Sequence, residues 1–282
     1  MFKRATLAPA IAILAALTAP AISADLDDII YAPMLPETRP VEIGSGWYLR
    51  GDIGYTASES GAAARYTVFD AGPPESYTST PFASSDLKTD WSAAIGVGYA
   101  FTDYLRADAT VEFGSGRFSG NSVSGDPCPV DPVAGTSCAF SDGADYKGYG
   151  LMANAYFDLG TFAGFTPYVG GGLGMTQVLW DDLSRINRCV DGGTTCSAAI
   201  AGATSHPGET EWRFTYALMA GFSYDITEQL KLDIGYRYQN IDSGAMFGYD
   251  SASRLAGATG VQAFDDGIES HEIRAGLRYE LW

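Results

Sequence analysis

The segment GWYLRGDIGYT, residues 46–56, decides the fold because its apolar and polar side chains alternate strictly. The apolar positions are Trp47, Leu49, Ile53 and Tyr55, and the positions between them are Tyr48, Arg50, Asp52 and Gly54. Neighbouring side chains of a β-strand point to opposite faces, so this period of two predicts a strand with one apolar and one polar side.

The same alternation recurs in seven further segments, which are 88–101, 105–113, 147–159, 167–177, 211–225, 230–239 and 270–281. Each is about ten residues long, the length that a tilted strand needs to cross a bilayer. An even number of antiparallel strands can close into a ring with both termini at one end. The sequence therefore predicts an all-β protein, an eight-stranded antiparallel up-and-down transmembrane β-barrel.

The connections between these segments alternate in length. Three are short, namely 102–103, 160–166 and 226–229, and four are long, namely 57–87, 114–145, 178–210 and 240–267. Bacterial outer-membrane barrels combine short periplasmic turns with longer extracellular loops. We therefore expect the four long connections to be mobile extracellular loops that could contact a surface ligand, since they are rich in Ser, Thr, Gly, Asp and Tyr.

The first 24 residues have the layout of a secretory signal peptide. Lys3 and Arg4 precede an apolar stretch, and small residues come before Asp25. The alternative is a retained transmembrane helix, which Pro9 and Pro20 disfavour. We predict that residues 1–24 are cleaved, that 25–45 form a flexible leader and that 46–282 form the barrel, which places the protein in the outer membrane of a Gram-negative bacterium.

The composition points to the same environment. The 282 residues carry a net charge of −17, which excludes a nucleic-acid binder because such proteins present basic surfaces. Only 18% of the residues are charged and 46% are hydrophobic, whereas soluble domains average about 25% charged residues. The chain is thus short of the groups that cover a water-facing surface, and outer-membrane lipids are its expected surroundings.

The polar faces of the predicted strands carry charges of both signs. We expect these charges to pair inside the narrow lumen of an eight-stranded barrel, which side chains can fill. The alternative is a solvated sheet surface on a soluble protein. The predicted lumen network comprises Arg50, Asp52, Arg106, Asp108, Glu112, Arg213, Lys231, Asp233, Arg237, Glu272, Arg274, Arg278 and Glu280.

Four cysteines lie in two of the long connections, Cys128 and Cys138 in the second and Cys189 and Cys196 in the third. In an exported chain an even number of cysteines favours disulfides, and the local pairs are the simplest of three possible connectivities. Paired CxxC spacing is missing and no histidine is close in sequence, which disfavours zinc. We expect no metal and no cofactor.

The two histidines offer little for catalysis. In Ser270-His271-Glu272 the neighbours of His271 would point to the opposite face of the strand, so the three side chains cannot form a catalytic triad. We interpret His271 as an interfacial residue near the outer rim and His206 as a solvated loop residue. No catalytic residue is predicted.

Four stretches resemble the small outer-membrane β-barrel proteins of the alphaproteobacterial surface-antigen type, distant relatives of the outer membrane protein A barrel. They are GWYLRGDIGY (46–55), ANAYFDLG (153–160), TPYVGGGLG (166–174) and HEIRAGLRYELW (271–282). The resemblance implies roles in envelope integrity or surface contact, and assembly by the outer-membrane insertion machinery. It implies a C-terminal assembly signal formed by Leu277, Tyr279, Leu281 and Trp282. Leu281 is in phase with the apolar face, and Trp282 is one position beyond.

The favoured function is that of a non-enzymatic outer-membrane barrel with a structural and surface-interaction role. A narrow pore for ions or small solutes is the first alternative, and an outer-membrane lipid-modifying enzyme is the second.

Overall fold

The computed structural model describes residues 46–60, 64–128, 134–190 and 202–281. They lie in one compact unit. The predicted signal peptide and leader, together with Cys196 and Trp282, fall outside the described residues. Within those residues, no helix is long and apolar enough to span a membrane.

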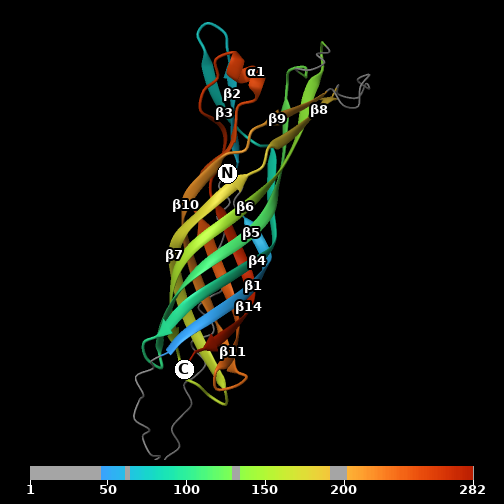
Figure 1. Cartoon of the computed structure of the whole chain (residues 1–282). Coiled ribbons are helices and arrows are strands. Elements are labelled where there is room, and N and C mark those ends of the chain that lie inside the picture. Colours follow the sequence, from blue (N-terminus) through green and yellow to red (C-terminus); the bar gives the residue numbers. More distant parts are fainter. Residues whose placement is uncertain (1–45, 61–63, 129–133, 191–201, 282) are drawn as a thin grey trace, which may run out of the picture. The chain divides into compact units, whose positions relative to one another are not determined.

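Long antiparallel strands wind around a common axis (Figure 1). In chain order they are β1 (Gly46–Ser60), β4 (Ser84–Ala100), β5 (Leu105–Ser124), β6 (Ser137–Asp158), β7 (Phe165–Trp180), β10 (Thr210–Asp225), β11 (Leu230–Ile241) and β14 (Ile268–Glu280). Each pairs with its neighbour along the chain, and β14 pairs with β1. The predicted all-β antiparallel fold is confirmed.

The long connections contain regular structure of their own, which the sequence did not predict. The first and the last contribute a four-stranded sheet in the order β12-β13-β2-β3, formed by β12 (Gly244–Gly248), β13 (Val261–Asp265), β2 (Arg65–Asp70) and β3 (Ser76–Pro81). The last also holds the short helix α1 (Ser251–Leu255). In the third, β8 (Leu183–Val190) pairs with β6, and β9 (Gly202–His206) pairs with β8.

The barrel strands also extend beyond their predicted ends, so the prediction that 57–87, 114–145, 178–210 and 240–267 are loops throughout is wrong. For example, β5 continues from Leu105 to Ser124, and β6 begins at Ser137. The two strands stay paired as far as Ser124 and Cys138. The predicted segments covered only the parts of the strands with alternating apolar residues, whereas backbone pairing continues through polar sequence.

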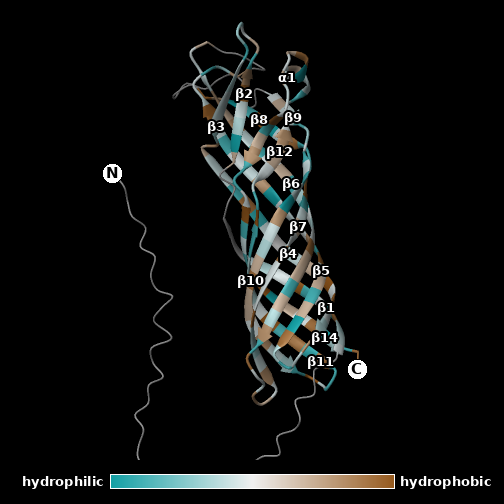
Figure 2. Ribbon diagram, turned by 90° about the vertical axis from the view of Figure 1, so that its left-hand side faces the viewer, coloured by the Kyte–Doolittle hydropathy of each residue, from teal (hydrophilic) through white to brown (hydrophobic). Residues whose placement is uncertain are grey.

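The alternating pattern sorts the side chains into an inner and an outer face. On β4, Ala94 is 2% exposed and the next residue, Ile95, is 62% exposed. Hydrophilic and hydrophobic residues accordingly alternate along the barrel strands in Figure 2. The apolar face points outward, and the polar face lines the interior of the ring.

Candidate functional site

The interior of the ring holds a network of buried ion pairs. At the end with the short connections, Arg106 donates its Nε–H to Asp158 at 3.0 Å. The same guanidinium lies 4.2 Å from the centre of the Tyr156 ring, in cation–π geometry. On the facing strands, Arg278 pairs with Asp233 at 3.3 Å. These pairs neutralise charges that would be costly to bury alone.

A second layer is organised around Arg50. Its guanidinium donates to both carboxylate oxygens of Asp52, at 2.8 and 2.7 Å, and to Asp108 at 2.7 Å. The same Arg50 nitrogen that bonds Asp108 also donates to the hydroxyl of Tyr156 at 2.6 Å. Asp108 further accepts a hydrogen bond from Asn154 at 2.8 Å. One arginine therefore links strands β1, β5 and β6 through charge-assisted hydrogen bonds.

The third layer contains two acids and two bases from three strands, β5, β11 and β14. Arg237 donates to Glu112 at 2.7 Å and lies 3.6 Å from Glu272. Arg274 donates to Glu272 at 2.9 Å and lies 3.6 Å from Glu112. Each carboxylate is thus shared by both guanidinium groups, which forms a closed four-membered network across the lumen.

Of the remaining three predicted network residues, Glu280 pairs with Arg278 of the first layer at 3.4 Å, whereas Arg213 and Lys231 have other partners. Arg213 bonds Asp265 of β13 at 2.8 Å, a partner from a predicted loop. Lys231 pairs with Asp225 at 2.8 Å and lies 3.7 Å from Glu280, near the short connections. Sequence reasoning missed the partners Tyr48, Asn154, Tyr156, Asp158 and Asp265. The first four are in phase with the inward-facing positions of their strands, which was the available signal.

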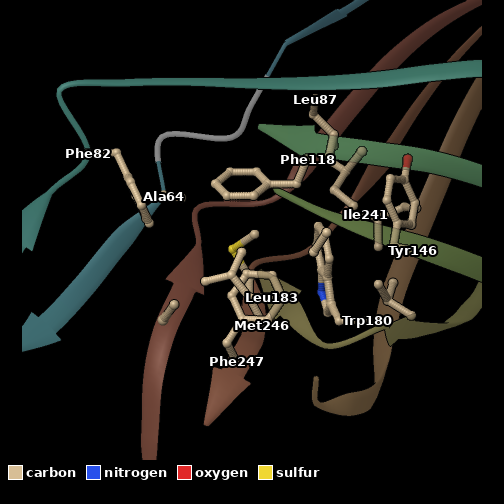
Figure 3. Close-up of a cluster of buried hydrophobic side chains, with 14 residues drawn as sticks. Ala64, Phe82, Leu87, Phe118, Tyr146, Trp180, Leu183, Ile241, Met246 and Phe247 are labelled. Carbon is tan, nitrogen blue, oxygen red and sulfur yellow. The ribbon is translucent and has the colours of Figure 1, made fainter. Parts of the chain in front are cut away.

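Above the third layer, a cluster of buried hydrophobic side chains fills the ring (Figure 3). Trp180 is central to it, with ring centres 5.4 Å from Phe247, 5.0 Å from Tyr146 and 6.1 Å from Phe118. The cluster also includes Met246, which is fully buried. It joins barrel strands β5, β6 and β7 to the loop strand β12, so the loops are packed onto the mouth of the ring.

A cavity of about 60 Å³ separates the hydrophobic cluster from the ionic network. Its lining includes Glu112, Arg237 and Arg274 from the network and Tyr146 and Ile241 from the cluster. A void of this size, lined in part by charged side chains, can hold a few water molecules. It lies between two filled layers of the lumen.

Three of the cysteines, Cys128, Cys138 and Cys189, lie close together near the start of β6. Cys128 and Cys138 form a disulfide, and Cys189 lies opposite Cys138 in the pairing of β6 with β8. Cys189 is also disulfide-bonded. Its predicted partner, Cys196, falls outside the described residues, so that pair stays a prediction. Within the described residues, no group of three or more His, Cys, Asp or Glu side chains could hold a metal ion.

The histidines occupy different environments. His271 lies on the outer face with its Nδ1 at 2.5 Å from the Tyr236 hydroxyl, whereas Ser270 and Glu272 are buried on the inner face. The three residues are therefore not brought together. His206 is only 3% exposed, so its interpretation as a solvated loop residue is wrong. It lies opposite Leu183 in the pairing of β8 with β9, which the sequence did not predict.

The predicted assembly signal is described in part. Leu277 and Tyr279 point outward and are about half exposed, and Leu281 follows the end of β14. This places an apolar edge beside the short connections. Its recognition by the insertion machinery stays a prediction.

Residues 10–280 match the family of the outer membrane protein beta-barrel domain. The chain belongs to this family. A Brucella suis relative described as "Uncharacterized protein" is 36% identical over 277 residues, which cover 92% of this chain and 93% of the relative. A Rickettsia bellii relative described as "Putative adhesin" is 27% identical, with coverage of 83% and 88%.

Family membership makes this chain an outer-membrane β-barrel protein of a Gram-negative bacterium, as the sequence predicted. Two solved structures are similar to it at low identity. Neisserial surface protein A is 19% identical with a TM-score of 0.38, and covers 83% of this chain and 96% of its own. The outer membrane protein OprG of Pseudomonas aeruginosa is 16% identical with a TM-score of 0.41, with coverage of 84% and 96%.

The pair between Arg213 and Asp265 can be tested by a double-mutant experiment. Both side chains are 2% exposed or less, and Arg213 also donates to the Ala245 carbonyl at 2.7 Å. Arg213→Met leaves a buried, unpaired carboxylate, which we expect to cost about 3–5 kcal/mol of unfolding free energy. Adding Asp265→Asn removes that charge and should restore much of the loss. Urea unfolding in detergent micelles, followed by tryptophan fluorescence, measures the unfolding free energy of both variants. Equal losses of unfolding free energy in the single and the double variant would contradict the pairing.

His206 predicts a pH-dependent stability of the loop strands. Burial lowers its pKa below the ordinary value of 6.5, and the neighbouring Arg185 adds to this. The unfolded chain therefore takes up a proton first as the pH falls, so stability present above pH 6.5 is lost below it. Hydrogen exchange of β8 and β9, corrected for intrinsic rates, should be faster at pH 5 than at pH 7.5. The difference should disappear in His206→Gln and persist in His271→Gln; its persistence in both would refute this assignment.

Proposed function

We propose that this protein is a closed, non-enzymatic barrel that supports the envelope and presents a folded loop region for surface contact. In this proposal eight strands cross the outer membrane, the short connections face the periplasm, and the four long connections face outside. The observation that carries it is the filled lumen. Ion pairs occupy the lower part, and the cluster around Trp180 occupies the mouth.

The same observation weighs against a pore. A conducting path would have to pass the Arg237–Glu112 pair and then the ring cluster of Phe118, Trp180 and Phe247. Both regions consist of side chains that contact each other directly. Separation of Ser270 and Glu272 from His271 likewise weighs against the lipid-modifying enzyme.

A surface-contact role is supported by apolar side chains on the loop sheet. Leu255 at the end of α1 is 91% exposed, and Val68 of β2, Tyr77 of β3 and Phe264 of β13 are about half exposed. Exposed apolar groups on an ordered scaffold are typical of interaction sites. The description of the Rickettsia bellii relative as an adhesin agrees with such a role.

The closed lumen predicts the electrical behaviour of the protein. The refolded full-length chain in planar lipid bilayers should give no stepwise conductance, because the ion pairs on one side of the cavity and the hydrophobic cluster on the other block the lumen. A general porin inserted under the same conditions serves as the positive control. Reproducible unitary steps from the wild-type chain would overturn the closed-lumen proposal and favour the narrow pore.

Surface contact can be tested with one substitution in α1. Non-adherent Gram-negative cells that display the full chain should adhere to host-cell monolayers more than cells that carry an empty vector. Leu255→Asp should reduce this gain several-fold, because it places a charge on the most exposed apolar side chain. Ser251→Asp in the same helix is the matched control and should not. If wild-type display does not raise adhesion, the contact role is wrong.

A further inference from the structure

Three basic side chains gather on the outer wall of the barrel. They are Lys88 of β4, Arg117 of β5 and Lys147 of β6, with exposed fractions of 73%, 72% and 56%. Lys88 lies directly opposite Arg117, and Lys147 lies opposite Ser115, two residues from Arg117. Three neighbouring strands thus present bases at one level.

This level coincides with the upper boundary of the apolar wall. Trp91, Phe113 and Tyr149 face outward on the same three strands, one short step closer to the short connections. From this aromatic row to the short connections, the outward positions of β4, β5 and β6 carry no Asp, Glu, Lys or Arg. Aromatic rows mark the interface of a barrel with its membrane, so the bases lie at the depth of the lipid headgroups.

The cluster is unusual within this molecule. Other bases of the described barrel strands have side chains that are at most about one-fifth exposed, because they point into the lumen; they are Arg50, Arg106, Arg213, Lys231, Arg237, Arg274 and Arg278. The whole chain has a net charge of −17. Among the described barrel strands, this cluster therefore offers the exposed bases that an anionic headgroup could contact.

The two lysines are paired with acids only at long distance. Lys88 Nζ lies 3.5 Å from Asp86, and Lys147 Nζ lies 3.9 Å from Asp181. Both distances exceed those of an ordinary N–H···O hydrogen bond. Arg117 bonds Asp145 at 2.6 Å, yet it also lies opposite Lys88. Like charges directly opposite across two strands destabilise a sheet, and an anion between them would relieve this repulsion.

Two hollows on the same strands fit the two parts of a lipid. The upper, of about 690 Å³, is lined by Trp91, by the three bases and by the two acids Asp145 and Asp181. The lower, of about 840 Å³, is an apolar groove floored by small residues such as Ala109 and Ala153; its walls include Ile95, Val111, Leu151 and Leu173. Arg117 and Val111 are six residues apart on β5, or about 15 Å in depth on a tilted strand, which is one leaflet of hydrocarbon.

We propose that Lys88, Arg117 and Lys147 bind the phosphate of an outer-leaflet glycolipid whose acyl chain lies in the groove below. This inference rests on the proposed orientation, with the long connections outside. The neighbouring acids hold the local charge near balance, so a free phosphate ion gains little. A lipid gains the contacts of the groove as well.

The test uses folded full-length chain in detergent micelles, with lipid binding measured by native mass spectrometry. The probes are bis-phosphorylated lipid A, the same lipid without phosphates, and inorganic phosphate. Lys88→Gln/Lys147→Gln should weaken binding of the phosphorylated lipid about 30-fold, since each base near a membrane surface contributes about fivefold. Binding of the phosphate-free lipid should be unchanged.

Matched controls separate the site from general electrostatics. Arg65→Gln/Arg188→Gln removes the same charge from exposed positions on the loop strands β2 and β8 and should leave binding intact. Ala153→Trp fills the groove and should weaken binding of both lipids, whereas Ala275→Trp on β14 should not.

Several results would overturn the site. These are equal lipid affinity in wild type and the Lys88/Lys147 double variant, an equal loss in the Arg65/Arg188 control, or inorganic phosphate that competes as well as the phosphorylated lipid. Each leaves the closed barrel intact, because conductance and adhesion are measured separately. Conversely, the wild-type chain could show unitary conductance and still lose affinity for the phosphorylated lipid in the Lys88/Lys147 variant. That result would contradict the closed lumen and support the lipid site.

Discussion

The pairing of β1 with β14 is the constraint on which the rest of the structure depends. In a bilayer every backbone N–H and C=O group must find a partner within the protein, so a sheet with free edges cannot cross. Here β1 pairs on one side with β4 and on the other with β14, and the ring has no unpaired edge between Tyr48 and Tyr55. Closure with few strands makes the interior narrow, and inward side chains must then fill it.

The narrow interior determines how the charges are arranged. Most of the buried carboxylates described above meet a guanidinium from another strand, as Glu112 meets Arg237, 125 residues away in the chain. Such pairs contribute little net stability compared with an apolar filling, yet a strand shifted by one residue would turn its charges toward the lipid. The ion pairs thereby favour one register of the ring.

Much of this arrangement follows from local sequence pattern, and some of it does not. Period-two alternation predicts the strands and their inner face because each residue of a strand turns its side chain by half a revolution. The cluster of Phe118, Trp180 and Phe247 was not predicted, because it depends on which loops pack together. Phe118 and Trp180 do continue the inward phase of their strands, and that phase was the signal. His206 was misread because its burial depends on contacts between β8 and β9, which no local pattern encodes.

Closure of the ring also brings the first and the last of the long connections together. The sheet β12-β13-β2-β3 combines residues 65–81 with residues 244–265, and its central contact pairs Ala263 with Tyr66. An antibody raised against this sheet in the folded protein would bind a conformational epitope formed by both segments. A peptide that contains only one of the two segments would not reproduce this epitope. Antibody binding to one segment would therefore depend on substitutions in the other.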